Sequence, residues 1–367
     1  SGGLDSAAIV AAYREATSAP LKTFTVGFAE QSFDESRLAR LTAERYETEH
    51  HELIAEPELP GSLDAYTEAF DEPYGESSPI PIYYVARLAR QQITVALGGD
   101  GGDEALGGYN HYVGAGYLEQ YKTLPGALSR SLIPWVANRL PVSHSRASFS
   151  YLARRFVAAA GMSAEQAHLE WISVVDAAAK GAIAGEALRG LQPSLRMIEA
   201  AHRRGRDLDP LNRLMYADAQ VYLREGILQK VDRMTMAHGL EARGPFLDQE
   251  LAAFALRIPG RDKIRSRVRK RFFRRLLRDR LPAETLKQRK MGFVPPLAKW
   301  LCEELRGPML DTLTAKALAE GGYFQPAAVQ RMIDEHLQRR RDHSRALWGL
   351  MAFERWRRRW ASAPQTD

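Results

Sequence analysis

Short β-rich runs alternate with helical patterns over the first hundred or so residues of the chain. Strands that alternate with helices in this way form a parallel sheet with helices on both faces. The pattern therefore predicts an α/β core over residues 1–115. The expected elements are a helix from Leu4, a strand at 22–28 (KTFTVGF), a helix from Asp34 through Tyr46, a strand at 48–54 (TEHHELI), helices around 57–91 and a strand at 92–98 (QITVALG).

The rest of the chain, residues 116–367, shows helical periodicity broken by Pro and Gly, and no alternation with strands. We therefore expect this part to be helical throughout or nearly so. A chain of 367 residues can bury a sizeable core, and its composition of 45% hydrophobic and 26% charged residues is ordinary for a globular protein.

Composition also limits the classes of function. No apolar run approaches the roughly 20 residues that span a bilayer, so we expect no membrane segment. The single cysteine, Cys302, excludes an intrachain disulfide framework and favours a reducing compartment, so a cytoplasmic location is expected. The net charge of +6 is compatible with phosphate-bearing ligands, but it is too small to argue for a nucleic-acid partner.

The chain opens with the string SGGLDS, which comprises Ser1, Gly2, Gly3, Asp5 and Ser6 around Leu4. The glycines allow close backbone approach to a ligand, and the unpaired N–H groups of the helix that follows attract anions. The Asp5 carboxylate would repel a bare phosphate unless a divalent cation such as Mg²⁺ lay between them. The residues alone fit a phosphate loop and a simple glycine-rich helix cap equally well.

A phosphate loop of this kind follows a buried strand, and no strand precedes Ser1 in this sequence. We therefore expect the chain to be the later part of a longer protein.

The string LGGDGGDEALGGY, residues 97–109, follows the third expected strand and places three acids among glycines. Ligands bind at the carboxyl ends of strands in open parallel sheets, so Asp100 and Asp103 are candidates to hold a metal or a proton. Asp103 and Glu104 are also explained by the preference of acids for the first turn of a helix.

Five motifs in order resemble the synthetase domain of the glutamine-dependent asparagine synthetases and their relatives. The resemblance covers nearly the whole chain. It rests on SGGLDS, TFTVGF, GGDGGDEALGGY, KVDRMTMAHGLEARGPFLD and RKMGFVPPLAKWL. It implies an ATP pyrophosphatase fold, similar to the adenine nucleotide alpha hydrolases, followed by a mostly helical C-terminal part. It also implies that residues 1–367 form one asparagine synthetase domain that is truncated at its N-terminus.

The activity that this resemblance implies is cleavage of ATP between its α and β phosphates to form an acyl-adenylate, followed by attack of ammonia. The cofactors would be ATP and Mg²⁺, and the acceptor would be aspartate or another carboxylate. Ser1, Gly2, Gly3, Asp5 and Ser6 would then form the pyrophosphate loop. The other implied ligands are Val26 and Gly99 for the adenosine part, and Asp5 with Asp103 for the metal.

The resemblance also gives Asp100 and Lys290 catalytic roles. Lys290 falls where the family has a lysine that stabilises developing charge, although a solvated helix face within the basic run 261–290 explains it as well. Asp100 replaces a glutamate that is thought to manage protons during ammonia attack. Its side chain is one methylene shorter, which leaves the identity of the acceptor open.

A further set of candidates lies on an expected helix at Lys230, Asp232 and Arg233, where the spacing brings residues 230 and 233 to one side. Contact with substrate and simple ion pairing explain these three residues equally well.

In the family a glutaminase domain precedes the synthetase domain and supplies ammonia from glutamine. We expect such a domain upstream in the parent chain, and a homodimer stays an open alternative to a monomer. One alternative hypothesis is a relative that acts on another carboxylate, of the polysaccharide- or exosortase-associated type or of the β-lactam-forming type. Two others are an RNA-modifying enzyme of the same fold and a scaffold protein that has lost activity.

Overall fold

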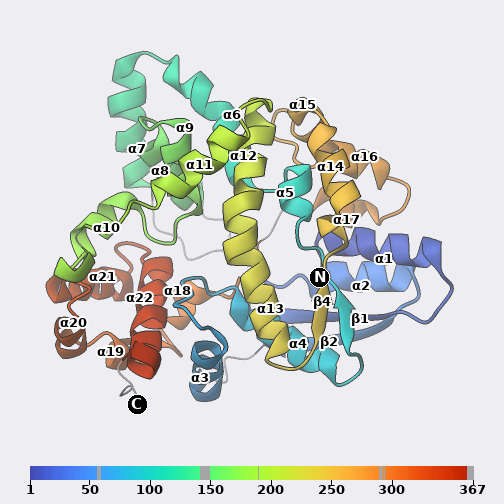
Figure 1. The fold of residues 1–367 in the computed structure, drawn as a ribbon, viewed down its shortest axis with the longest axis horizontal. Helices are drawn as coiled ribbons and strands as arrows, with labels where there is room; N and C mark the ends of the chain where they lie inside the picture. Colours follow the sequence, from blue (N-terminus) through green and yellow to red (C-terminus); the bar gives the residue numbers. More distant parts are fainter. Residues whose placement is uncertain (56–58, 141–148, 189, 289–291, 293, 362–367) are drawn as a thin grey trace.

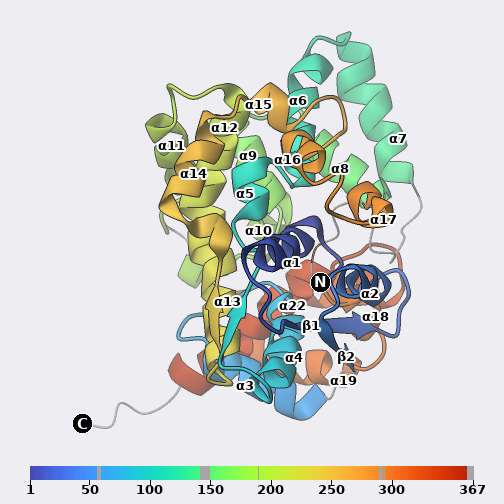
Figure 2. The same cartoon turned by 90° about the vertical axis from the view of Figure 1, so that its right-hand side faces the viewer.

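A computed structural model gives the fold and describes residues 1–55, 59–140, 149–188, 190–288, 292 and 294–361. It is a mixed α/β structure that is mostly helical (Figures 1 and 2). The strands are β1 (Lys22–Phe28), β2 (Glu49–Ala55), β3 (Val95–Leu97) and β4 (Glu241–Arg243).

Helices between residues 1 and 140 include those that surround the sheets. They are α1 (Leu4–Ala16), α2 (Ser36–Arg45), α3 (Leu59–Ala69), α4 (Pro79–Arg90), α5 (Gly102–Leu106), α6 (Asn110–Lys122), the π-helical η1 (Leu128–Leu132) and α7 (Ile133–Arg139).

Helices in the middle of the chain form the upper-left part of Figure 1 and its long central column. They are α8 (Phe149–Ala159), α9 (Ala164–Ile172), α10 (Ala177–Ile183), the 3₁₀ turn η2 (Glu186–Leu188), α11 (Leu195–Arg204), α12 (Pro210–Asp218), the π-helical η3 (Ala219–Leu228), α13 (Gln229–Met236) and the 3₁₀ turn η4 (Pro245–Leu247).

The remaining helices complete the upper right and lower left of Figure 1. They are α14 (Gln249–Arg257), α15 (Gly260–Lys263), α16 (Arg271–Leu276), α17 (Ala283–Lys287), α18 (Leu297–Trp300), α19 (Arg306–Thr312), α20 (Ala315–Gly321), α21 (Pro326–Leu337), α22 (Ser344–Trp356) and the π-helical η5 (Arg357–Ala361). None of the helices in the described ranges is both long and apolar enough to cross a membrane.

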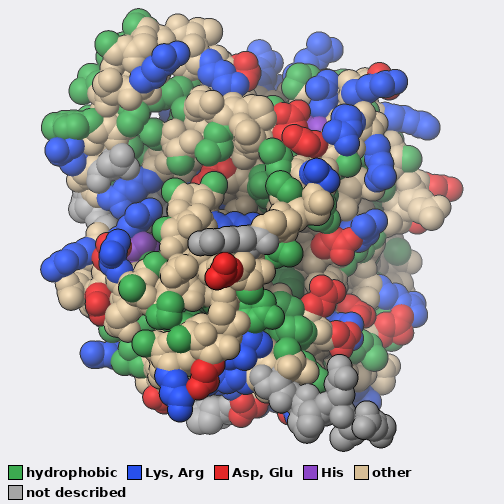
Figure 3. All heavy atoms as spheres, turned by 60° about the vertical axis from the view of Figure 1, so that its left-hand side comes forward, with side chains coloured by type: hydrophobic (Ala, Val, Ile, Leu, Met, Phe, Trp, Pro, Cys, Tyr) green, Lys and Arg blue, Asp and Glu red, His purple; other side chains and the backbone are tan. Residues whose placement is uncertain are grey.

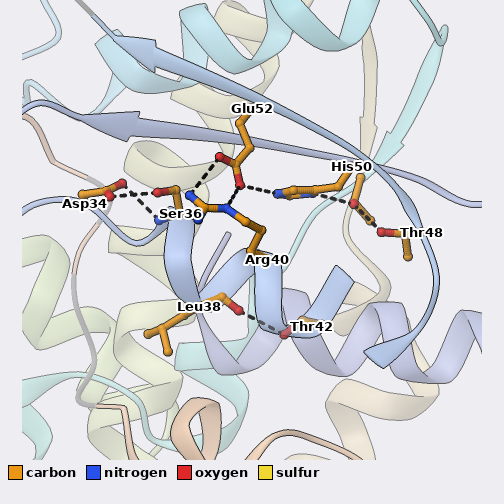
Figure 4. Close-up of polar contacts among 9 residues, drawn as sticks. Asp34, Ser36, Leu38, Arg40, Thr42, Thr48, His50 and Glu52 are labelled. Atoms are coloured by element: carbon orange, nitrogen blue, oxygen red, sulfur yellow. Dashed lines mark hydrogen bonds and ion pairs between the residues drawn. The ribbon is translucent and has the colours of Figure 1, made fainter. Parts of the chain in front are cut away.

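The strands pair in parallel, as predicted, but they form two small sheets in the described part of the chain. β1 pairs with β2 from Lys22 opposite Glu49 to Phe28 opposite Ala55. α2 and α4 cover opposite faces of this sheet (Figure 2). Glu52 of β2 accepts a 2.8 Å hydrogen bond from Arg40 of α2, which ties one of these helices to the sheet (Figure 4).

The second sheet adds one short strand to the part of the chain that we expected to be helical throughout or nearly so. β3 pairs in parallel with β4, which lies in the part of the chain after residue 116. The ladder extends by one hydrogen bond from Gly98 N to Arg243 O at 2.8 Å. A strand of three residues whose partner lies far away in sequence has no local pattern by which it could be recognised.

A continuous helical column runs from α12 through η3 to α13 and crosses the middle of the molecule (Figure 1). It starts where Asp209 caps the backbone N–H groups of Leu211 and Asn212, with Pro210 at the first helical position. Asp218 lies at the end of α12 and Lys230 lies in α13. The column therefore links the upper helices to the sheets.

Two apolar clusters hold the parts of the chain together. The larger one packs β1, α3 and α4 against the C-terminal helices and includes the almost fully buried Trp300 and Trp348. A second cluster packs the apolar face of α1 against Phe246 and Phe273. On the face shown in Figure 3, Lys and Arg side chains are interspersed with Asp and Glu side chains.

Candidate active site

Three loops meet at the N-terminus of α1, as the alternation of strands and helices predicted. A Cβ added to Gly99 would lie 2.9 Å from the Cβ of Asp5, and one added to Gly2 would lie 2.7 Å from the carbonyl oxygen of Glu35. The loop after β3 and the loop after β1 therefore approach the first turn of α1 so closely that glycine is required at both contacts.

A cavity of about 1790 Å³ opens beside these loops. It extends from the α/β core to the helices of the second half of the chain, since Tyr222, Lys230 and His343 also line it. Most of the predicted site residues line it, namely Ser1, Gly3, Asp5, Ser6, Val26, Gly99, Asp100, Asp103 and Lys230.

The first turn of α1 offers hydroxyl and backbone donors to this cavity. The Ser1 and Ser6 hydroxyls lie 2.8 Å apart, and the Gly3 N–H donates to the Ser1 hydroxyl at 3.3 Å. Small donors at the positive end of a 13-residue helix form a favourable environment for an anion.

The carboxylates of Asp5 and Asp103 converge on one cation, the ammonium group of Lys270. Lys270 Nζ lies 2.6 Å from Asp103 Oδ1 and also pairs with Asp5 Oδ1. The three side chains are almost entirely buried, with exposed fractions of 11% for Asp5, 8% for Asp103 and 4% for Lys270. Two buried carboxylates need such a cation, because an uncompensated buried charge is strongly destabilising.

Lys270 is the residue that sequence reasoning missed. It lies in the basic run 261–290, most of which suggested a solvated face. Its backbone adopts the left-handed conformation (φ 51°, ψ 38°) immediately before α16, which is uncommon for a residue other than glycine. No local signal distinguishes it from its basic neighbours, because its acidic partner Asp5 is 265 positions away.

A third buried carboxyl group lies beside these ion pairs. Burial raises the pKa of Glu104 to about 7, and the nearby charge of Asp103 adds to the effect. The Tyr109 hydroxyl donates a 2.5 Å hydrogen bond to Glu104 Oε1, and burial raises the pKa of Tyr109 well above its usual value. Glu104 is therefore a buried acid with a raised pKa, and the preference of acids for the first turn of a helix does not by itself explain it.

Another polar group lines the cavity where α13 meets the start of α4. Lys230 Nζ donates to Ser78 Oγ at 2.9 Å and lies 3.8 Å from Glu76 Oε2. Tyr222 donates to Glu76 Oε1 at 3.1 Å. Glu76 and Ser78 belong to the string GESSPIP, to which sequence reasoning gave no role.

The remaining candidates are placed differently. Asp232 is exposed, Arg233 pairs with Asp71, and neither is among the residues that line the cavity. Gly2 packs beneath the loop against Glu35, and Lys290 lies outside the described residues.

Comparison with known proteins agrees with this arrangement. The family model described as asparagine synthase matches residues 1–358. A Mycobacterium bovis protein named as a glutamine-hydrolysing asparagine synthetase is 33% identical over 97% of this chain and 53% of its own length. "Asparagine synthetase [glutamine-hydrolyzing] 1" of Bacillus subtilis is 29% identical over 97% of this chain and 55% of its own length.

The chain thus spans about half the length of the curated relatives that it matches. The family match extends over both the loops that converge on α1 and the helices that complete the cavity. The chain belongs to the asparagine synthase family.

Proposed function

We propose that this chain is the synthetase part of an ATP-dependent ligase that adenylates a carboxylate and converts it to an amide with ammonia. Aspartate, which would yield asparagine, is the first candidate acceptor. We also propose that residues 1–115 form an ATP pyrophosphatase fold. Family membership and the cavity at the N-terminus of α1 support both statements.

The observation that carries the proposal is the convergence of Asp5 and Asp103 on a single ammonium group. The Lys270 cation occupies the position between two carboxylates that a divalent cation would favour, so the donor set fits Mg²⁺. Bound there, Mg²⁺ would neutralise phosphate charge during the reaction. Asp5 and Asp103 are the proposed ligands.

ATP would lie with its phosphates at the first turn of α1, against Ser1, Gly3 and Ser6. Val26 and Gly99 line the adjoining part of the cavity and are the proposed contacts of the adenosine part. An oxygen of the acceptor carboxylate attacks the α-phosphorus of ATP, and the bond to the β-phosphate oxygen breaks. Pyrophosphate leaves, and the products of this step are an acyl-adenylate and pyrophosphate.

Lys270 would contact the β- and γ-phosphate oxygens once its two carboxylate partners are engaged elsewhere. Its ammonium group is already at the helix N-terminus where these phosphates are expected. Charge develops on the leaving pyrophosphate as the bond breaks, and a fixed cation stabilises that charge.

In the second step, ammonia attacks the carbonyl carbon of the adenylate, AMP leaves, and one proton is lost from nitrogen. We propose that Asp100 accepts this proton, since it lines the cavity beside Gly99. Lys290 is proposed to stabilise the charge in both steps. Lys230 is proposed to bind the acceptor, whereas Asp232 and Arg233 are less well placed for contact with substrate.

Ammonia would come from glutamine through a glutaminase domain in the parent chain. This part of the proposal rests on the relatives whose names describe them as glutamine-hydrolysing and of which this chain covers about half.

The test is to measure AMP, pyrophosphate and amide product from ATP, Mg²⁺, ammonia and aspartate with the parent chain and with Asp103→Ala. We expect the products in equal amounts, and we expect their loss in the variant. Asp207→Ala is the matched control, because its side chain is 91% exposed and its ion pair with Arg206 is long, at 3.8 Å.

ATP binding without aspartate-dependent release of pyrophosphate would exclude aspartate as the acceptor and direct the search to other carboxylates. Full activity in Asp103→Ala would exclude the proposed role of the Asp5 and Asp103 pair.

A further inference from the structure

Two histidines and an aspartate from three different helices meet above the candidate active site. His111 Nε2 of α6 lies 2.7 Å from Asp218 Oδ2, and His168 Nε2 of α9 lies 2.7 Å from Asp218 Oδ1 at the end of α12. The three ligand atoms lie within 4.8 Å of one another. We name these residues the His–Asp–His cluster; the helices that carry them adjoin one another in the upper left of Figure 1.

The cluster contains a carboxylate that cannot be stabilised by water. The side chains of Asp218 and His168 are 0% exposed, and that of His111 is 13% exposed. Within the described parts of the chain, the ion-pair partners of Asp218 are these two imidazoles, with neither Lys nor Arg among them. The compensating positive charge must therefore come either from protons on the imidazoles or from a bound cation.

The surroundings of His168 orient its ring in the way that metal sites require. Its other nitrogen, Nδ1, lies 3.0 Å from Nε2 of His202, a residue of α11. His202 Nδ1 in turn faces Glu165 Oε1 at 4.0 Å. Without a cation, His168 Nε2–H would donate to Asp218 Oδ1. With a cation at Nε2, the proton of His168 would be on Nδ1 and would donate to His202 Nε2. Ligating histidines in proteins commonly donate their second N–H to an outer partner in this manner.

The kind of ligands present selects the cation. Two imidazole nitrogens and one carboxylate oxygen suit Zn²⁺, whereas Mg²⁺ and Ca²⁺ prefer oxygen ligands alone. Ligands at about 2.0 to 2.2 Å from a tetrahedral Zn²⁺ lie roughly 3.3 Å apart. The ligand atoms of the cluster lie within 4.8 Å of one another, and each imidazole contacts a different oxygen of Asp218 at 2.7 Å, so the side chains would shift to reach this spacing. His111 also lines the cavity, which gives an ion a path to the cluster.

We propose that His111, His168 and Asp218 form a Zn²⁺ site, with a water molecule as the fourth ligand, that fastens α6, α9 and α12 together. The site is separate from the Asp5 and Asp103 pair but lies next to it. The ring of His111 stacks on Tyr109 with centroids 5.2 Å apart, and Tyr109 donates to Glu104. Zn²⁺ would thus stabilise the helices around α5, the helix that carries Glu104.

The test is a Zn²⁺ titration of the metal-free parent chain against a chromogenic chelator, with Mg²⁺ in excess to occupy any oxygen-only site. We expect one Zn²⁺ per chain, a higher midpoint of thermal unfolding, and the visible bands of tetrahedral Co²⁺ when Co²⁺ replaces Zn²⁺. His202→Asn should weaken binding about 10- to 100-fold as an outer partner, and His111→Asn should weaken it more.

His51→Asn serves as the control. It removes a histidine from the distant β2 strand and should bind Zn²⁺ like the parent chain. His111→Asn is the decisive variant because His111 is the least buried of the three and the fold should tolerate its replacement. Absence of stoichiometric binding by the parent chain, or equal affinity in His111→Asn, would overturn the proposal.

Discussion

Replacement of Lys270 by methionine should destabilise the protein by removing the ammonium group that pairs with two buried carboxylates. Methionine matches the lysine side chain out to Cε, so the replacement removes the terminal ammonium group with its charge and its hydrogen-bond donors. Loss of one partner from a buried ion pair typically costs about 3 to 5 kcal/mol of unfolding free energy. Lys270 faces both Asp5 and Asp103 and is only 4% exposed, so we expect a loss in this range.

Mg²⁺ should restore part of this loss, because it can take the place of the ammonium group between the carboxylates. At about 100 times its dissociation constant, a ligand that binds only the folded state adds about 2.7 kcal/mol to the unfolding free energy. In the parent chain Mg²⁺ must compete with Lys270, so its stabilising effect there should be smaller.

The measurement is urea unfolding, followed by tryptophan fluorescence and far-UV circular dichroism, with and without Mg²⁺. Coincident transitions from the two signals establish that a free energy can be extracted. Lys316→Met is the control, because Lys316 is 87% exposed and its ion pair with Glu320 is long, so its replacement should change stability by less than about 1 kcal/mol. The reasoning is refuted if Lys270→Met is as stable as the parent chain, or if Mg²⁺ stabilises both equally.

Three more predictions concern single residues. A Cβ on Gly108 would lie 1.7 Å from Asp103 Oδ1, so Gly108→Ala should abolish pyrophosphate release. Gly116→Ala is the control and should leave the rate of release unchanged, because a Cβ on Gly116 meets nothing within 4 Å. Asp100→Asn should keep aspartate-dependent exchange of pyrophosphate into ATP. It should lower the rate of amide formation, measured as labelled product, by about 10²- to 10⁴-fold. Asp100→Glu should keep most of the rate of amide formation. Burial lowers the pKa of Lys263 to about 8 from 10.5, so the unfolded chain binds more protons than the folded chain between these pH values. The unfolding free energy should therefore rise with pH over this range. In urea unfolding, the parent chain should gain about 3 kcal/mol relative to Lys263→Met between pH 8 and 10.5. A pH-independent difference would exclude a lowered pKa for Lys263.

Local patterns were sufficient to predict the strands and helices of the α/β part, although not the division of its strands between two sheets. The run KTFTVGF forms β1 over Lys22–Phe28, and its last four residues are buried. The convergence of the SGGLDS and GGDGGDE loops followed from a property of parallel sheets, whose strand ends meet at one edge. Several residues that line the cavity could therefore be predicted as candidate ligands without any knowledge of long-range contacts.

Features that depend on distant partners were not predictable in this way. β4 is a strand because β3 supplies its hydrogen bonds, and its three residues carry no period of their own. Lys263 and Lys270 both lie in a run of basic residues that composition assigns to solvent, yet they are 0% and 4% exposed. Lys263 is buried against Asn212, at 2.7 Å, and Lys270 against Asp5 and Asp103.

The boundary near residue 115 therefore separates two patterns in the sequence but does not separate two functions. Asp5 and Asp103 belong to the α/β part, while the cation between them, Lys270, comes from the helical part. The apolar face of α1 is likewise buried by Phe246 and Phe273, and Lys230 reaches Ser78 across the same cavity. Residues 1–115 alone would keep the carboxylates but lose both their cation and the apolar cover of α1. The helical part is thus required to complete the candidate site, because it supplies the positive charge that pairs with two buried acids and that the proposed triphosphate would need in the same place.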